Sequence, residues 1–202
     1  MKLYFSPSAC SLSPHIALRE AGLEFELVRV DLKSHTVVAD GSDFSKISPK
    51  GYVPVLELDD GTRLSEGPVI VQYIADLKPE VGLAPKAGTL ARYRLQEWLA
   101  FINSEVHKGF GPLFRPTTPD AYKAIARENL VNRLGFVAAH LEQNPFLLGN
   151  QFSVADAYLF TVLNWGQWTG IDVQQWPSLA AFQARVAERP AVKEALAAEA
   201  AA

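Results

Sequence analysis

A stretch rich in proline and glycine divides this 202-residue chain into two parts with different patterns. The stretch, KPEVGLAPKAG at residues 78–88, holds two prolines and two glycines, which interrupt helices and strands alike. Before it, short strand patterns alternate with helical ones, and after it only helical spacing recurs. With 49% hydrophobic residues, the chain can bury the cores of two small domains. We therefore predict a mixed α/β domain over residues 1–80, a linker over 81–88 and an all-helical domain over 89–202.

The first part predicts a single α/β unit. We expect strands at 2–5 and 25–32, joined by a helix that begins near Ser13 and stops at Gly22. An ambiguous segment follows at 36–48. Two strands around the turn Asp59-Asp60-Gly61 and a helix at 68–77 complete the unit. Two strands joined by a helix should be parallel. The last two strands should be antiparallel, because their connection is so short.

The second part shows no convincing strand. Helical spacing recurs at residues 89–110, 119–142, 153–168 and 178–188, and an alanine-rich tail that can fray follows Pro190. SVAD at 153–156 predicts a capping box, in which Ser153 accepts from a later N–H and Asp156 reaches back to the cap. We expect Asp156 to serve folding rather than catalysis, and loss of the cap to cost about 1 kcal/mol.

The composition argues against several classes of partner. The net charge of −3, with no Lys/Arg-rich run, argues against a nucleic-acid surface. The start, MKLYFSPS, has no apolar signal segment, and no apolar run approaches the roughly 20 residues of a membrane helix. A single cysteine cannot form an internal disulfide, which fits a reducing compartment. We expect a cytoplasmic protein without membrane or nucleic-acid partners, and without a metal, since the four histidines share no ligand spacing.

The only cysteine, Cys10, lies in SACSLSPH, just before the first predicted helix. Unpaired N–H groups and the positive end of the helix dipole should favour its thiolate form. Residues 10–13, CSLS, form a C-x-x-C motif with serine in place of the second cysteine. Disulfide chemistry here would need an external thiol, and glutathione is the most available one in a cytoplasm. The alternative interpretation is a small buried hydrophobic side chain.

Two further motifs allow both a functional and a structural interpretation. A cis Val53–Pro54 bond would turn the N–H and C=O of Val53 outward as an edge for a peptide, although an ordinary edge-strand proline is the simpler interpretation. Glu66 and Gly67 fall at a predicted helix start. Free N–H groups there can bind a carboxylate, and the Glu66 side chain can bind an ammonium group. Glu66 can equally serve only to match the helix dipole.

Together these motifs resemble the cytosolic glutathione transferases, specifically the bacterial beta class. The likeness covers nearly the whole chain and is carried by MKLYFSPSACSLSPHIALRE, SPKGYVPVLELDDGTRLSEG, VQYIADLKP, EVHKGFGPLFRP and FSVADAYLFT. The resemblance implies a thioredoxin-like domain that binds glutathione and an all-α bundle domain that supplies most of the pocket for a small hydrophobic electrophile. It also implies a homodimer with its sites near the interface.

The resemblance also implies roles for individual residues. Cys10 would stabilise or covalently pair with the glutathione sulfur, and His107 would be its catalytic hydrogen-bond partner. Val53 would bond the cysteinyl backbone, and Glu66 with Gly67 would hold the γ-glutamyl end. The implied glutathione-binding residues are Cys10, His35, Val53, Glu66, Gly67, Ala100, Asn103, Ser104, Glu105 and His107, with Ser104 and Glu105 partly across the dimer interface.

The block around His107 allows a geometric expectation. Its α-helical spacing predicts one shared face for Ala100, Asn103, Ser104 and His107. Candidate residues for the lining of the electrophile pocket are Phe110, Phe114 and Trp165. Two positions depart from the class: His35 replaces a lysine that binds the glycyl carboxylate, and Ala100 replaces an asparagine. Lys33 and Lys50 are candidate substitutes for the missing lysine.

The expected function is conjugation of reduced glutathione to hydrophobic electrophiles, which yields a thioether. A related activity would use Cys10 covalently, for thiol–disulfide exchange or for reduction of hydroperoxides. The alternative is a non-catalytic protein on the same fold that binds glutathione or hydrophobic ligands, because a fold does not by itself fix a function.

Overall fold

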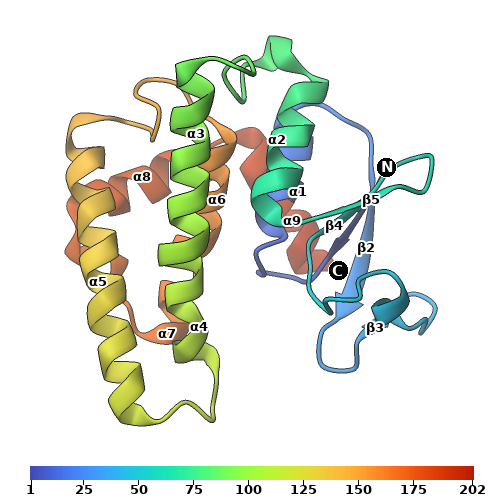
Figure 1. Cartoon of the computed structure of the whole chain (residues 1–202), viewed down its shortest axis with the longest axis horizontal. Coiled ribbons are helices and arrows are strands. Elements are labelled where there is room, and N and C mark those ends of the chain that lie inside the picture. Colours follow the sequence, from blue (N-terminus) through green and yellow to red (C-terminus); the bar gives the residue numbers. More distant parts are fainter. The chain divides into compact units, whose positions relative to one another are not determined.

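The structure, a computed structural model, describes residues 1–202 and forms two compact units (Figure 1). Unit 1 consists of Met1–Ala84 together with Arg189–Ala202, and unit 2 consists of Pro85–Glu188. The predicted change from mixed α/β to all-helical structure is confirmed, as is the overall fold class. One feature differs from the predicted domain limits: the C-terminal segment after Glu188 groups with the first unit.

Unit 1 is built on one five-stranded sheet. Its strands are β1 (Lys2–Phe5), β2 (Glu26–Asp31), β3 (Thr36–Val37), β4 (Val55–Glu57) and β5 (Arg63–Ser65), in the order β3-β2-β1-β4-β5. β1 and β2 are parallel, as the helical connection between them predicts. β4 and β5 are antiparallel around the Asp-Gly turn, so this hairpin prediction is also confirmed.

The first helix, α1 (Leu12–Glu20), begins slightly earlier than predicted, with Ser11 rather than Ser13 as its N-cap residue. Every residue from Leu12 to Leu18 is buried. The predicted stop is confirmed: Gly22 has a φ of 63°, and its N–H bonds to the carbonyl of Arg19. A left-handed glycine directly after the helix satisfies carbonyls that the last turn leaves unpaired.

The ambiguous segment 36–48 forms two short elements, β3 and the 3₁₀-helix η1 (Phe44–Lys46). Phe44 is completely buried and packs in a core cluster with Tyr4, Val30 and Val37. Strand β3 has only two residues and pairs with β2, so its conformation depends on a neighbour rather than on local spacing. A strand of two residues is too short to show a periodicity in the sequence.

The C-terminal helix α9 (Pro190–Ala201) packs on α1 within unit 1, and Figure 1 shows the two helices close together. The sequence predicted a tail that can fray. The structure shows instead a helix that buries Val192, Ala195 and Glu199 on one face. At its start, the Arg189 guanidinium forms two hydrogen bonds to the Glu20 carboxylate, at 2.5 and 2.8 Å. These contacts join the start of α9 to the last residue of α1.

Unit 2 is all-helical, as predicted. Its α-helices are α3 (Leu90–Phe101), α4 (Lys108–Phe114), α5 (Asp120–Gln143), α6 (Val154–Leu163), α7 (Gly166–Thr169) and α8 (Pro177–Ala187). Unit 2 also contains η3 (Ile102–His107) and η4 (Val173–Gln175), while the short helix η2 (Pro79–Val81) belongs to unit 1. All residues of α6 are buried, so this helix forms the centre of the unit. None of the helices combines the length and the hydropathy that a membrane span requires.

The predicted capping box at the start of α6 is confirmed. The Asp156 carboxylate accepts the Ser153 N–H at 2.8 Å and, beyond the prediction, the Leu147 N–H at 2.8 Å. The Ser153 hydroxyl donates to the same carboxylate at 2.8 Å. Burial raises the pKa of Asp156 to about 6, although these donors act in the opposite direction. Asp156 therefore joins the cap of α6 to the loop that precedes it.

Candidate active site

Cys10 lies in the loop between β1 and α1, immediately before the N-cap residue Ser11. The Ser11 hydroxyl closes this loop, because it donates to the carbonyl of Ser6 and accepts the Ser6 N–H, both at 3.2 Å. Cys10 is half-buried, and its thiol donates to the Val53 carbonyl at 3.2 Å. The thiol thus meets a polar backbone group and is not simply a filler among apolar side chains.

The Val53–Pro54 bond is cis, and the binding of a peptide at the Val53 backbone stays a prediction. β4 begins directly afterwards, and its first residue, Val55, pairs with Ser65 at the end of β5. A Cβ on Gly67 would lie 3.9 Å from the Pro54 ring. The structure therefore brings the Cys10 thiol, the Val53 backbone and the Glu66-Gly67 motif to one region of unit 1.

Glu66 is the N-cap residue of α2 (Gly67–Leu77) and has a φ of 71°, in the left-handed region that non-glycine residues rarely adopt. Its exposed carboxylate is paired with Lys50, whose Nζ lies 2.6 Å from Oε1. Lys50 also donates to the Ser65 hydroxyl at 3.3 Å. A strained, exposed glutamate at a helix start is a conformation that often accompanies a functional role.

His35 is exposed and also adopts a positive φ, of 55°. Its ring packs against Gly51, where a Cβ would lie 3.3 Å from Cε1. The ammonium group of the neighbouring Lys50 bonds to the Glu66 carboxylate. Lys33 and Lys50 are the two lysines considered as substitutes for the lysine missing at position 35. The Lys50 side chain bonds to Glu66, a proposed site residue. For Lys33, the backbone N–H bonds to the Asp31 carboxylate at 2.8 Å.

In unit 2, the segment predicted as regular α-helix contains a π-helix, η3. The N–H of Lys108 bonds to the carbonyl of Asn103, five residues earlier, instead of four. η3 contains four proposed site residues, which are Asn103, Ser104, Glu105 and His107. Single π-turns inside α-helices frequently occur at functional sites, and no spacing in the sequence signals this one.

The predicted shared face is only partly correct. Asn103 and His107 are brought together, whereas Ala100 and Ser104 are exposed. The residue that groups the first two is Tyr158 of α6, whose hydroxyl donates to Asn103 Oδ1 at 2.9 Å and lies 2.6 Å from His107 Nδ1. Tyr158 belongs to the FSVADAYLFT block, but the sequence analysis gave it no role.

The Glu105 side chain forms an ion pair. Its carboxylate accepts the Nε–H of Arg133 at 2.7 Å. Both side chains are partly exposed, so the pair can exchange with other polar partners at small cost.

An aromatic cluster lies beside His107 in unit 2. The rings of His107 and Trp165 are 4.7 Å apart and nearly perpendicular. Phe110 and Phe114 each lie 5.7 Å from Trp165, also edge to face. The three residues predicted as lining of an electrophile pocket therefore form one cluster beside His107, but Phe110 and Trp165 are buried and only Phe114 is exposed.

A pocket of about 550 Å³ opens between α3 and α5 in unit 2. Its lining residues are Arg94, Glu97, Trp98, Phe101, Arg133, Phe136 and His140. The Phe136 ring is 57% exposed although it packs 5.3 Å from the Phe101 ring and 5.9 Å from the Trp98 ring. An aromatic side chain exposed to this degree beside two arginines is typical of a protein interface.

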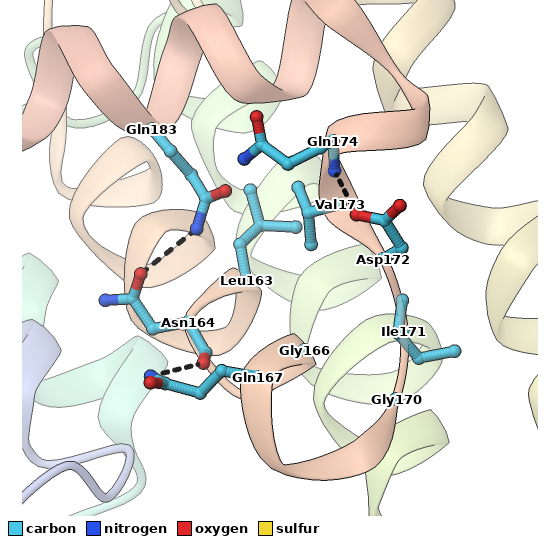
Figure 2. A pocket seen from close by; sticks show the side chains of 10 residues that line it. All are labelled: Leu163, Asn164, Gly166, Gln167, Gly170, Ile171, Asp172, Val173, Gln174 and Gln183. Atoms are coloured by element: carbon cyan, nitrogen blue, oxygen red, sulfur yellow. Dashed lines mark hydrogen bonds between the residues drawn. The ribbon is translucent and has the colours of Figure 1, made fainter.

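A second pocket, of about 400 Å³, is formed by α6, α7, η4 and α8 and contains no proposed site residue (Figure 2). Its polar side chains bond to one another: Gln183 donates to Asn164 Oδ1 at 3.0 Å. Only glycine fits at Gly166 on its rim, because a Cβ there would lie 2.6 Å from the Ile171 carbonyl oxygen.

Two family models match the chain. The model described as "Glutathione S-transferase, N-terminal domain" matches residues 7–77, and the one described as "Glutathione S-transferase, C-terminal domain" matches residues 101–190. The two matches fall on the α/β and the helical part of the chain.

Similar proteins include glutathione S-transferase GstA of Escherichia coli O157:H7, which is 47% identical over 98% of each chain. The structure solved as a ternary complex of BphK, a bacterial GST, is 59% identical with a TM-score of 0.97, and covers 99% of this chain and 100% of that chain. The bacterial beta-class glutathione S-transferase of Sphingomonas chungbukensis is 49% identical with a TM-score of 0.95, over 98% of each chain.

Proposed function

Since the chain belongs to the beta class of the glutathione S-transferase family and is an enzyme that conjugates glutathione, we propose that its second substrates are small hydrophobic electrophiles. In this reaction the glutathione thiol loses its proton, and the sulfur forms a bond to an electrophilic carbon. In a substitution, the leaving group departs with the electron pair of the bond that breaks. In an addition to an activated double bond, the π pair moves to the neighbouring atom, which then takes up a proton. The exposed Phe114, which packs on the buried Trp165, supports an apolar second substrate.

The main support for the proposed glutathione site is that Cys10, Val53 and the Glu66-Gly67 motif lie close together in unit 1. The Cys10 thiol bonds to the Val53 carbonyl, and the adjoining Glu66-Gly67 motif begins α2. A backbone edge at Val53 can pair with the cysteinyl part of glutathione, and Glu66 can bind its γ-glutamyl ammonium group. Gly67 N–H at the helix start can bind the neighbouring carboxylate. We assign His35 to the glycyl carboxylate.

The proposed contribution of unit 2 comes from one short segment. His107 would hydrogen-bond the reacting sulfur, and an imidazole can both donate and accept a proton. The other residues that we assign to glutathione are Ala100, Asn103, Ser104 and Glu105. The Glu105 carboxylate is paired with Arg133 in a partly exposed ion pair, which a polar group of glutathione can replace at small cost.

Cys10 would add a second, disulfide-exchange activity. Its thiolate attacks the glutathionyl sulfur of a mixed disulfide, forms a Cys10–glutathione disulfide and releases the other thiol. A second glutathione thiolate then attacks this disulfide, which returns Cys10 to the thiolate and yields oxidised glutathione. Cys10 is half-buried and thus partly accessible, which supports this step.

Replacement of Cys10 by alanine tests these assignments. We expect Cys10→Ala to abolish exchange with a mixed disulfide of glutathione, because no other cysteine exists in the chain. Conjugation with a chlorodinitrobenzene, followed by thioether absorbance, should fall by no more than about tenfold, since glutathione supplies its own nucleophile. Unchanged exchange would contradict the role of Cys10. Binding to immobilised glutathione without turnover of any tested electrophile would instead favour a binding protein.

We assign the pocket between α3 and α5 to the interface of a homodimer. Its exposed Phe136, the flanking arginines and Glu97 give a patch that is apolar at its centre and charged at its rim. Such a patch can pair with the same chain in a closed two-fold assembly. We also assign the protein to the cytoplasm, which its lack of a cysteine pair supports.

Light scattering after size-exclusion chromatography tests the dimer. We expect twice the mass of one chain for the wild type and a shift toward one chain for Phe136→Glu, because the substitution puts a charge at the centre of the patch. Tyr122→Glu, on the exposed start of the same helix, serves as control and should leave the mass unchanged. A wild type that elutes as a single chain at all concentrations would contradict the assignment.

A further inference from the structure

Tyr158 lies at the centre of unit 2, and its hydroxyl stands between two residues of η3. The side chain is almost fully buried, at 1% exposure. A tyrosine hydroxyl carries one proton, so it can donate a single hydrogen bond. That proton is given to Asn103 Oδ1, at 2.9 Å. The oxygen of Tyr158 is then an acceptor toward its other close neighbour.

The other neighbour is His107, whose Nδ1 lies 2.6 Å from the same hydroxyl oxygen. Because the Tyr158 proton is already directed to Asn103, this short contact requires the proton of His107 to reside on Nδ1. A neutral imidazole carries only one N–H, so Nε2 must hold a lone pair. The contacts of Tyr158 therefore select one of the two tautomers of His107.

Two other histidines show how partners fix the proton in this protein. In His15, Nε2 accepts from Arg19 at 2.9 Å, so the proton is on Nδ1, which contacts Glu199 at 3.1 Å. In His140, Nε2 lies 3.1 Å from the carbonyl oxygen of Leu147 and must be the donor. The chain thus contains one histidine of each tautomer whose partners are independent of Tyr158.

We infer that Tyr158 and Asn103 act as positioning residues that keep His107 in the tautomer whose Nε2 can accept the proton of the glutathione thiol. This inference rests on the proposed function of His107. In the proton transfer, the thiol proton moves to Nε2, the sulfur becomes thiolate, and the resulting imidazolium keeps its Nδ1–H on the Tyr158 oxygen. An imidazole in the wrong tautomer would offer Nε2–H and could not accept this proton.

The substitution that tests this inference most directly is at Asn103. In Asn103→Leu the Tyr158 hydroxyl loses its acceptor and is expected to donate to His107 Nδ1, which forces the imidazole proton onto Nε2. Asn103→Asp retains an acceptor for the hydroxyl and should preserve the wild-type tautomer. Tyr158→Phe removes the partner of Nδ1 and should give a mixture of both forms.

Two-bond ¹H–¹⁵N correlation spectra of the full chain with ¹⁵N-labelled histidine read the tautomers directly. The spectra would be recorded near about pH 8, above the ordinary imidazole pKa. The His107 signals are identified by their loss in His107→Gln, while His15 and His140 serve as references for the two forms. We expect the His107 proton on Nδ1 in the wild type and in Asn103→Asp, and on Nε2 in Asn103→Leu. A wild-type proton on Nε2, or no change in Asn103→Leu, would overturn the inference.

Kinetics separate this inference from the proposed function. Asn103→Leu should lower kcat by at least about tenfold, in line with the loss of a general base, and Asn103→Asp should restore most of it. A tautomer that switches without a change in kcat would support the inference and contradict the proposed role of His107. A lower kcat with an unchanged tautomer would overturn the inference and leave the role of His107 intact.

Discussion

Replacement of Asp156 by alanine is expected to lower the free energy of unfolding by about 3–5 kcal/mol, well above the roughly 1 kcal/mol of a helix cap alone. The difference arises because the carboxylate also accepts the Leu147 N–H in a fully buried place. Alanine would leave that N–H and the Ser153 N–H without their acceptor. Each buried donor that loses its partner costs about 1–3 kcal/mol.

Urea unfolding followed by circular dichroism measures this loss. Asp120→Ala is the matched control, because Asp120 also lies in the first turn of a helix but is fully exposed. The control should change stability by no more than about 0.5 kcal/mol. Equal losses in the two variants would show that Asp156 acts only through the helix dipole.

Asp156 should also make stability depend on pH. Burial raises its pKa to about 6 in the folded chain, against an ordinary value of 3.8. Between these values the folded protein holds a proton that the unfolded chain releases, so the stability from this group is complete below the lower value and is lost as pH rises through the higher one. Relative to the non-titrating Asp156→Asn, the wild type should lose about 3 kcal/mol between about pH 4 and about pH 7. If the difference in free energy of unfolding between the wild type and Asp156→Asn stayed constant over this pH range, the raised pKa of Asp156 would be contradicted.

Replacement of Glu199 by alanine is expected to cost about 3–5 kcal/mol as well, because it breaks a buried charged network. The Glu199 carboxylate contacts His15 at 3.1 Å and accepts the Ser8 N–H at 2.9 Å. His15 is completely buried and in turn accepts from Arg19. Without Glu199, the His15 Nδ1–H would lose its acceptor inside the contact between α1 and α9.

Thermal and urea unfolding of Glu199→Ala test this network. Glu194→Ala is the control, since Glu194 lies on the same helix and pairs with Arg19 at 3.1 Å but is exposed. The control should change stability by less than about 1 kcal/mol. We also expect a higher glutathione KM in Glu199→Ala, because Ser8 belongs to the loop that holds Cys10. A stability loss as small as that of Glu194→Ala would show that α9 does not depend on the buried carboxylate.

Under the proposed assignment of Glu66 to the γ-glutamyl ammonium group, glutathione would displace a lysine. Its carboxylate is paired with Lys50 at 2.6 Å, and both side chains are about half exposed. An exposed pair of this kind contributes only about 0–1 kcal/mol, so a substrate ammonium group can replace the lysine at little cost. The freed Lys50 would then be available to the carboxylates of the same substrate, near His35.

Local signals in the sequence determined a large part of this protein. Gly22 stops α1, SVAD caps α6, and the Asp-Gly pair turns β4 into β5, because each signal acts on neighbouring backbone groups. The same is true of Cys10 and Glu66, whose places before helix starts follow from short motifs. The resemblance to the family then supplied roles for these residues that their spacing alone did not contain.

Only the tertiary structure decided the features that join distant parts of the chain. Tyr158 meets His107 across 51 positions, and Glu199 meets His15 across 184. The π-turn of η3 replaces the α-helical spacing that the sequence predicted, and no local propensity distinguishes the two. Such features arise when side chains from separate elements compete for the same donors, acceptors and buried space. Periodicity and capping describe one element at a time, and therefore cannot predict them.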